Sequence, residues 1–222
     1  MGNQGMTLGE WINGLSLIPD DAKDLIVDFF VGHIMSDIQL LKNIFPKRMS
    51  INITCEKEDP NEQDTLNAQN LLRAFIPDVQ RIKLFRVPLE KNFSRQHIGM
   101  ANLKELGLFY QVDLNLDEIC SWNVENCTIS TMTDRMSLRD LNRFFKLWIK
   151  GSNPKLRELS IHWKTEIIPD WNVLLRGLKA VETEAEEEEE RKFTIRNIRG
   201  ICAVIQIEYD EERARAVCTF SN

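Results

Sequence analysis

The amino-acid sequence predicts an α/β fold in which parallel strands and packing helices alternate, and in which an antiparallel hairpin ends the chain. Three observations lead to this prediction. An apolar spacing that fits a short strand recurs along the chain. A helix over residues 137–150 has clear signals at both ends. Near the C-terminus, the runs 193–195, 201–209 and 214–220 alternate apolar and polar residues, which is typical of antiparallel strands.

The recurring spacing is one apolar residue, a second three places on, and a third two places after that. The last two residues alternate along a strand and point inward, while the first closes the preceding turn. The clear copies are Val79/Ile82/Leu84, Leu103/Leu106/Leu108, Val124/Cys127/Ile129 and Leu156/Leu159/Ile161, and a weaker copy is Pro46/Met49/Ile51. This spacing resembles the core of leucine-rich repeats, so we expect an irregular leucine-rich-repeat-like solenoid with parallel strands and right-handed crossovers.

The helix over residues 137–150 is the most clearly marked element. Ser137 can cap its N-terminus, and Gly151 followed by Pro154 ends it. Its apolar residues fall on one face at helical spacing, so this face should pack on the sheet. Further helices are expected, from their apolar periodicity, over residues 7–15, 22–31, 37–44, 62–75 and 170–178.

Charge and hydropathy argue against two classes of partner. The net charge of −6 comes from seven glutamates between Glu182 and Glu190; without them 28 basic residues face 27 acidic ones, which gives +1. No basic stripe with interleaved aromatics occurs, so we expect no nucleic acid partner. No apolar run approaches the roughly 20 residues that cross a bilayer, and no signal peptide is evident. We therefore expect a soluble chain, cytoplasmic or nuclear, without a membrane partner.

The sequence offers no motif for catalysis or for cofactor binding. The three histidines stand far apart, and the five cysteines form no CxxC pair of the kind that structural zinc needs. The glycines form neither of the common nucleotide-binding loops. We therefore predict no catalytic, metal-binding or cofactor-binding residues. An enzyme of unrecognised type would require a catalytic pair assembled in a cleft from distant segments.

Residues 138–161, with the sequence LRDLNRFFKLWIKGSNPKLRELSI, resemble the hallmark of the type 2 F-box-associated domain of nematode F-box proteins. The motif residues are Leu141, Asn142, Phe145, Trp148, Gly151, Asn153, Pro154 and Leu156. Residues 87–98 fit the family more loosely, and the resemblance extends from about Trp11 to the C-terminus. Where the family's last hairpin has an aspartate-glycine turn, this chain has Asp210 followed by Glu211. No clear F-box precedes the domain.

The resemblance implies a non-catalytic module that recruits the target of a Skp–cullin–F-box ubiquitin ligase, with Skp adaptor and cullin as possible partners. The alternative is an F-box-less inhibitor that neutralises a partner stoichiometrically, without ubiquitin transfer. The expected organisation is a helical N-terminal segment at 1–45, either a degenerate F-box or a linker; the F-box-associated domain at 46–181; an acidic loop at 182–191; and a β-hairpin cap of the same domain at 192–222.

Three surface segments are the candidates for binding the target protein, because loops on a rigid scaffold can vary without unfolding it. They are the loop before the acidic run, the acidic run itself, and residues 90–97. The individual candidates are Lys164, Glu166, Asp170 and Trp171 in the first, Glu187, Glu188 and Glu189 in the second, and Lys91 and Arg95 in the third.

Overall fold

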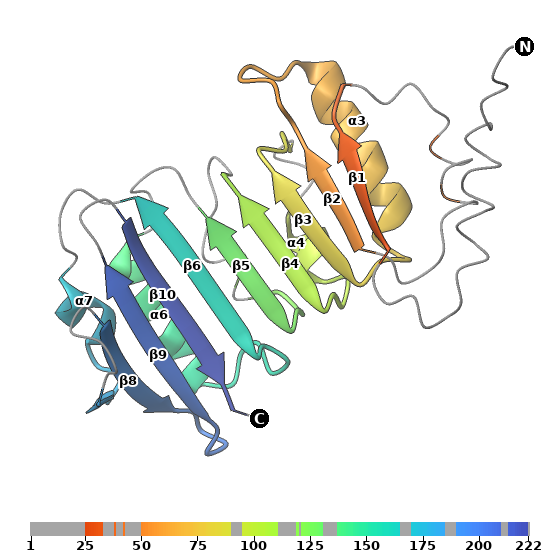
Figure 1. Cartoon of the computed structure of the whole chain (residues 1–222). Coiled ribbons are helices and arrows are strands. Elements are labelled where there is room, and N and C mark those ends of the chain that lie inside the picture. Colours follow the sequence, from red (N-terminus) through yellow and green to blue (C-terminus); the bar gives the residue numbers. More distant parts are fainter. Residues whose placement is uncertain are drawn as a thin grey trace, which may run out of the picture.

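The chain forms a mixed α/β structure built on one ten-stranded sheet (Figure 1). The computed structural model describes residues 25–32, 38, 42, 50–89, 95–110, 119, 121–130, 137–164, 170–184, 190–209 and 213–221. The strands lie in the order β1-β2-β3-β4-β5-β6-β10-β9-β8-β7, parallel from β1 to β6 and antiparallel from β6 onward. The predicted α/β class, with parallel strands followed by antiparallel ones, is therefore confirmed, and the sheet stays open.

The elements alternate along the parallel part and then become mainly strands. The parallel part contains β1 (Ile26–Phe30), β2 (Ser50–Thr54), α3 (Glu62–Phe75), β3 (Arg81–Phe85), α4 (Arg95–Gly99), β4 (Glu105–Phe109), β5 (Asn126–Ser130), α6 (Leu138–Ile149) and β6 (Glu158–Lys164). The remainder contains α7 (Trp171–Leu175), β7 (Val181–Thr183), β8 (Glu190–Arg196), β9 (Cys202–Tyr209) and β10 (Arg213–Phe220).

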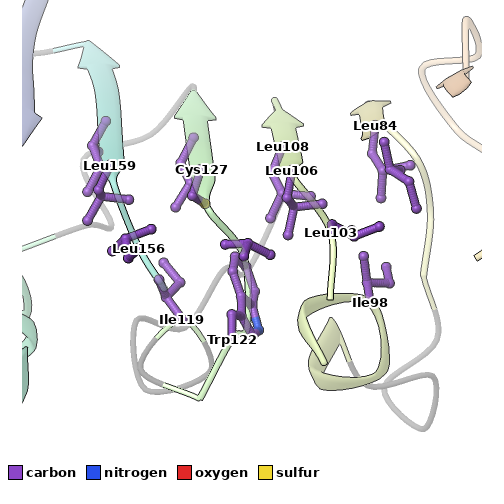
Figure 2. Close-up of a cluster of buried hydrophobic side chains, with 14 of the residues drawn as sticks. Leu84, Ile98, Leu103, Leu106, Leu108, Ile119, Trp122, Cys127, Leu156 and Leu159 are labelled. Carbon is purple, nitrogen blue, oxygen red and sulfur yellow. The ribbon is translucent and has the colours of Figure 1, made fainter. Parts of the chain in front are cut away.

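Each clear copy of the apolar spacing forms one parallel strand, as predicted. The inward pairs are no more than 1% exposed and lie in register, and they are Ile82/Leu84, Leu106/Leu108, Cys127/Ile129 and Leu159/Ile161. The first residue of each copy is buried too. Figure 2 shows side chains of β3 to β6 on one side of the sheet, together with Ile98 of α4 and the ring of Trp122. Alternation thus places one apolar layer under the sheet.

Close approach in this layer requires a glycine at the end of α4. A Cβ placed on Gly99 would lie 2.0 Å from Cδ1 of Trp122, a distance that no real side chain tolerates. The Trp122 ring, 2% exposed, therefore packs directly on the backbone of α4. Hydrogen bonds at this end include one from the Asn123 amide to the Gly99 carbonyl, at 2.6 Å.

Two expectations for the N-terminal part are wrong in the described residues. Ile26–Phe30, predicted as part of a helix over 22–31 within a helical segment, is strand β1. Its sequence IVDFF is rich in β-branched and aromatic residues, and Phe29 is buried against Phe75 of α3 with ring centroids 5.1 Å apart. The weaker apolar copy, Pro46/Met49/Ile51, places the strand two residues too early, because the two inward residues of β2 are Ile51 and Ile53.

The other predicted helices have three different outcomes. α3 and α6 are confirmed almost to the residue, with caps from Asn61 and Ser137. The helix predicted over 170–178 is shorter, since α7 ends at Leu175. Residues 7–15 lie outside the described residues, as does most of 37–44.

The C-terminal hairpin is confirmed, and it belongs to a larger antiparallel unit than predicted. β10 pairs with both β6 and β9, so the hairpin extends the sheet. The ends of the predicted acidic loop at 182–191 are strands, because Glu182 lies in β7 and Glu190 begins β8. The ring of Trp148 in α6 lies 4.9 Å from that of Phe220, which joins the helix layer to this unit.

Candidate protein-binding surface

The sheet has one face that the described helices leave uncovered, and we call it the open face. Helices α3, α4 and α6 lie behind the sheet in Figure 1, and α7 is tied to α6. Residues that alternate with the buried ones point the other way and pair across neighbouring strands. The middle row of the open face is Asp28, Asn52, Lys83, Gly107, Thr128, Ser160, Val217, Gln206 and Lys192. This face therefore offers polar side chains in a fixed register.

Two phenylalanine rings interrupt that polar surface at the carboxyl ends of β3 and β4. Phe85 and Phe109 are register partners, and their rings stack with centroids 4.5 Å apart and planes inclined by 8°. Both side chains are half-buried. Gly107 makes room for the stack, since a Cβ there would lie 2.6 Å from Cε2 of Phe109. The two rings thus form one stacked apolar pair on the open face, which we call the plate.

Arg86 and Tyr110 each follow one of these phenylalanines directly in the chain. The Arg86 guanidinium lies over the Tyr110 ring, 5.6 Å from its centroid, and both side chains are exposed. Both residues have positive φ, 52° for Arg86 and 59° for Tyr110, where side-chain residues are uncommon. Backbone strain of this kind concentrates at functional sites. We call Phe85, Arg86, Phe109 and Tyr110 the aromatic cluster.

The charges around the aromatic cluster are unbalanced. Glu105 pairs with Lys83 at 3.0 Å and with Arg81 at 3.7 Å. No carboxylate among the described residues pairs with Arg86. Arg81 and Glu105 begin β3 and β4, at the opposite end of the strands from the cluster, so the charge within the cluster is the positive charge of Arg86.

A second polar group lies on the open face, on strands β6, β9 and β10. Ser160 Oγ lies 2.9 Å from Nε2 of His162, and Arg215 pairs with Glu208 at 3.4 Å. Partial burial, together with the positive charge of Arg215, lowers the pKa of His162 below its usual value, while Glu208 acts in the opposite direction. His162 is therefore mainly neutral at pH 7.

Cys127 and Cys218 are buried thiols in surroundings that disfavour the thiolate. Burial raises the pKa of the Cys127 thiol to about 12, and it also raises the pKa of Cys218. A thiolate is the reactive form of cysteine, so both thiols are inert near neutral pH. Among the described residues, no three His, Cys, Asp or Glu side chains gather as metal ligands do. None of the described helices is long and apolar enough to cross a membrane.

Few of the candidate binding residues predicted from the sequence can be placed. Asp170 is exposed and caps α7 by accepting from the Asn172 amide at 3.1 Å, while Trp171 is buried at 5% exposure. Lys164 ends β6 and Arg95 begins α4, and their side chains lie outside the described residues. Also outside are Lys91, Glu166, Glu187, Glu188 and Glu189. Their role in binding remains a prediction.

The topology nevertheless connects the predicted segments to one edge of the sheet. The row of paired residues that contains Phe109 continues through His162 and Arg215 to Glu190. The chain leaves β6 toward residues 165–169 at this edge, and it enters β8 from residues 185–189 at the same edge. The carboxyl ends of parallel strands are a common place for binding sites in open α/β sheets.

The aromatic cluster escaped the sequence prediction, although a local signal existed. In two successive apolar copies, the last inward residue is followed by Phe-Arg or Phe-Tyr, as in Leu84 followed by Phe85 and Arg86. Equivalent positions on adjacent parallel strands become neighbours, so the two dipeptides had to meet. Inspection of the residues after each copy, and not only those within it, would have found the cluster.

The family-motif residues hold the core together. The leucine, phenylalanine and tryptophan members are at most 3% exposed, namely Leu141, Phe145, Trp148 and Leu156. Asn142 donates from Nδ2 to the carbonyls of Leu174 and Arg176, at 2.6 and 2.9 Å. Asn153, with φ of 51°, donates to the carbonyls of Ile119 and Trp122 at 2.8 and 3.1 Å. These two buried amides therefore fasten neighbouring segments to the helix layer.

A rigid sheet that exposes aromatic rings beside an arginine is typical of a protein-interaction module. The family comparison agrees with this class. Residues 94–161 match the family model described as F-box associated, so the resemblance seen in residues 138–161 is confirmed. F-box associated domains are generally interaction modules associated with F-box proteins. No curated protein matches the chain.

Proposed function

We propose that this chain is the target-binding module of a ubiquitin ligase receptor of the Skp–cullin–F-box type, and that it catalyses no reaction itself. The F-box associated match supports the class of module. The observation that carries the proposal is the aromatic cluster, in which Phe85 and Phe109 stack on the open face and are followed by Arg86 and Tyr110, an exposed pair with the guanidinium over the ring. Aromatic residues and arginine are enriched at interface hot spots.

In this proposal the strands and helices act as an irregular leucine-rich-repeat-like scaffold. The helix layer fixes the strands, and the open face presents the target site. The loops that leave the same edge, with the candidates Lys164, Glu166, Lys91 and the glutamate run, would add variable contacts around it. The module works in the cytoplasm or the nucleus, where Skp adaptor and cullin are its partners.

The first test is affinity purification of the tagged full-length chain from its native cells, with mass spectrometry against a tag-only control. We expect Skp adaptor and cullin in stoichiometric amounts, together with a target protein. Absence of both ligase components would contradict the proposal. A single different abundant partner would then favour the stoichiometric inhibitor.

A variant separates target binding from ligase assembly. Arg86→Glu combined with Tyr110→Ala should remove the target and keep the adaptor and cullin, because both side chains are exposed and the core stays intact. The matched control is Arg139→Glu, an exposed arginine on α6, which should keep all partners. Loss of adaptor and target together from the double variant would place ligase binding on the open face.

A further inference from the structure

We infer that the aromatic cluster binds an acidic segment of the target protein that carries a large apolar side chain between aspartate or glutamate residues. This inference rests on the proposed function, because it assumes that the open face is where the target binds. It adds the chemistry of the bound segment, which neither the family match nor the sequence motifs indicate.

The acidic character follows from the charges. Lys83, two residues before Phe85 on the open face, pairs with Glu105, whereas no carboxylate among the described residues pairs with Arg86, whose guanidinium lies over the Tyr110 ring. A planar guanidinium can hold a carboxylate with two parallel hydrogen bonds, and it can stack on an aromatic ring at the same time. The Tyr110 ring therefore orients Arg86 without using its capacity for a carboxylate.

The apolar character follows from the plate of stacked rings. The rings of Phe85 and Phe109 are nearly parallel and stack on each other, and Tyr110, the residue after Phe109, is 42% exposed. A leucine or aromatic side chain placed on this plate would bury apolar area with little loss of freedom in the receptor, because the rings are already fixed. Gly107 leaves the space that the Phe109 ring occupies in this stack.

The backbone holds the cluster in the required arrangement. The Arg86 amide donates to the Phe109 carbonyl at 2.9 Å, and the Tyr110 amide donates to the Ser130 carbonyl at 2.7 Å. These bonds fix the backbone of both residues, which have positive φ. Such an arrangement favours one partner geometry over a general attraction for anions.

The chain's own glutamate run is too distant to occupy this site. Six strand spacings separate β8 from β3, which is roughly 29 Å at about 4.8 Å per strand. The residues between β7 and β8 are tied at both ends, so their middle reaches no more than about 14 Å from either strand. The glutamates of a second copy could reach the site, and the experiment distinguishes this case.

The test is a selection from a phage-displayed library of random peptides on the immobilised full-length chain, with a parallel selection on Arg86→Glu. We expect the wild type to enrich peptides with one large apolar residue flanked by Asp or Glu. Charge reversal should abolish this preference. An enriched motif without acidic residues, or the same motif from both selections, would overturn the inference.

Affinity measurements then assign the charge contact to Arg86. A fluorescein-labelled copy of the most enriched peptide should bind Arg86→Glu about thirtyfold more weakly than the wild type, as expected for a hot-spot residue. Arg86→Lys should recover part of the loss, and Arg139→Glu should bind as the wild type does. Replacing the peptide's acidic residues with amides should weaken binding to the wild type far more than to Arg86→Glu. Equal losses would contradict the contact.

Sedimentation equilibrium addresses the second copy. A wild-type dimer that Arg86→Glu converts to a monomer would show that the site binds the chain itself, and would overturn the inference. A monomer in both cases agrees with a target segment. Failure of the proposed function has a different signature, because native purification would then lack Skp adaptor and cullin while the peptide preference persisted.

Discussion

The core face and the open face of the sheet are built from alternate residues of the same strands, yet they differ in exposure and in composition. On the core face, the inward pairs of β3 to β6 are uniformly apolar and almost completely buried. On the open face, the register partners include Phe85 with Phe109, a glycine at 107, and the ionic group around Glu105. The core face therefore has the same kind of residue on each strand, whereas the open face has different residue types from strand to strand.

This difference separates the fold from the proposed function. Residues of the core face and helix layer depend on one another through packing, so substitutions there should change stability. Side chains on the open face have solvent or one another as neighbours, so substitutions there should change binding with smaller effects on stability. The four predictions below run from the largest expected change in stability to the smallest.

Trp148→Ala should lower the free energy of unfolding by about 3 to 5 kcal/mol, as for other large buried aromatics. The ring is 3% exposed and packs against Phe220, so its removal leaves a cavity between α6 and β10. Urea denaturation measures the change, and Leu147→Ala, on the half-buried side of the same helix, is the control. A loss below about 1 kcal/mol for Trp148→Ala would show that this helix face is not part of the core.

Asn142→Ala should cost about 1 to 3 kcal/mol, because it leaves the carbonyls of Leu174 and Arg176 without this buried donor. The effect should be concentrated at α7, which the amide ties to α6. Hydrogen exchange measured on both helices would locate it. Asn172→Ala, at an exposed position of α7, should change stability by less than about 0.5 kcal/mol. Equal costs for the two variants would contradict the role of Asn142.

Sequence reasoning predicted the core face better than any other part of the molecule. Its apolar spacing is repeated on strand after strand, so each copy supports the interpretation of the others, and β3 to β6 followed directly. The prediction of a helix at β1 failed because a short, mostly apolar segment such as IVDFF fits a strand or a helix equally well. Its pairing with β2 and the contact of Phe29 with Phe75 decide the case, and neither is visible locally.

The open face was predicted poorly for a related reason. The aromatic cluster depends on register between two strands that lie more than twenty residues apart in sequence. It also depends on the space that Gly107 leaves for the Phe109 ring. A single strand shows only an unremarkable Phe-Arg or Phe-Tyr. The residues predicted instead are charged except for Trp171, and Trp171 is buried. Surface chemistry follows from tertiary neighbours, which composition does not give.

Gly107→Ala should lower stability by about 1 kcal/mol and should weaken binding of the acidic peptide. The new methyl group would lie 2.6 Å from the Phe109 ring and 3.1 Å from Lys83, so the ring must move off its stack. Combining it with Phe109→Leu in a double-mutant cycle tests this reason. The smaller side chain should relieve part of the strain, so the double variant should lose less stability than the sum of the losses in the two single variants. Additive losses would mean that the ring and the glycine do not interact.

The smallest effect should be the contribution of His162 to the pH dependence of stability. Its pKa is lowered in the folded protein, first by partial burial and then by Arg215, with Glu208 opposing. Between the folded pKa and the ordinary value near 6.5, the unfolded chain binds a proton that the folded chain does not. Stability should therefore fall as the pH drops below about 6.5. Urea midpoints at neutral and mildly acidic pH measure this slope.

Two variants of the open face identify the source of this slope. His162→Gln should reduce the loss of stability on acidification, because the group that gains the proton in the unfolded chain is absent. Arg215→Gln should reduce it partly, because the remaining Glu208 favours the protonated imidazole in the folded protein. If both variants follow the wild-type midpoints at every pH, another group dominates the titration. In that case the polar group around Ser160 would contribute little to stability, as the contrast between the core face and the open face predicts for side chains of the open face.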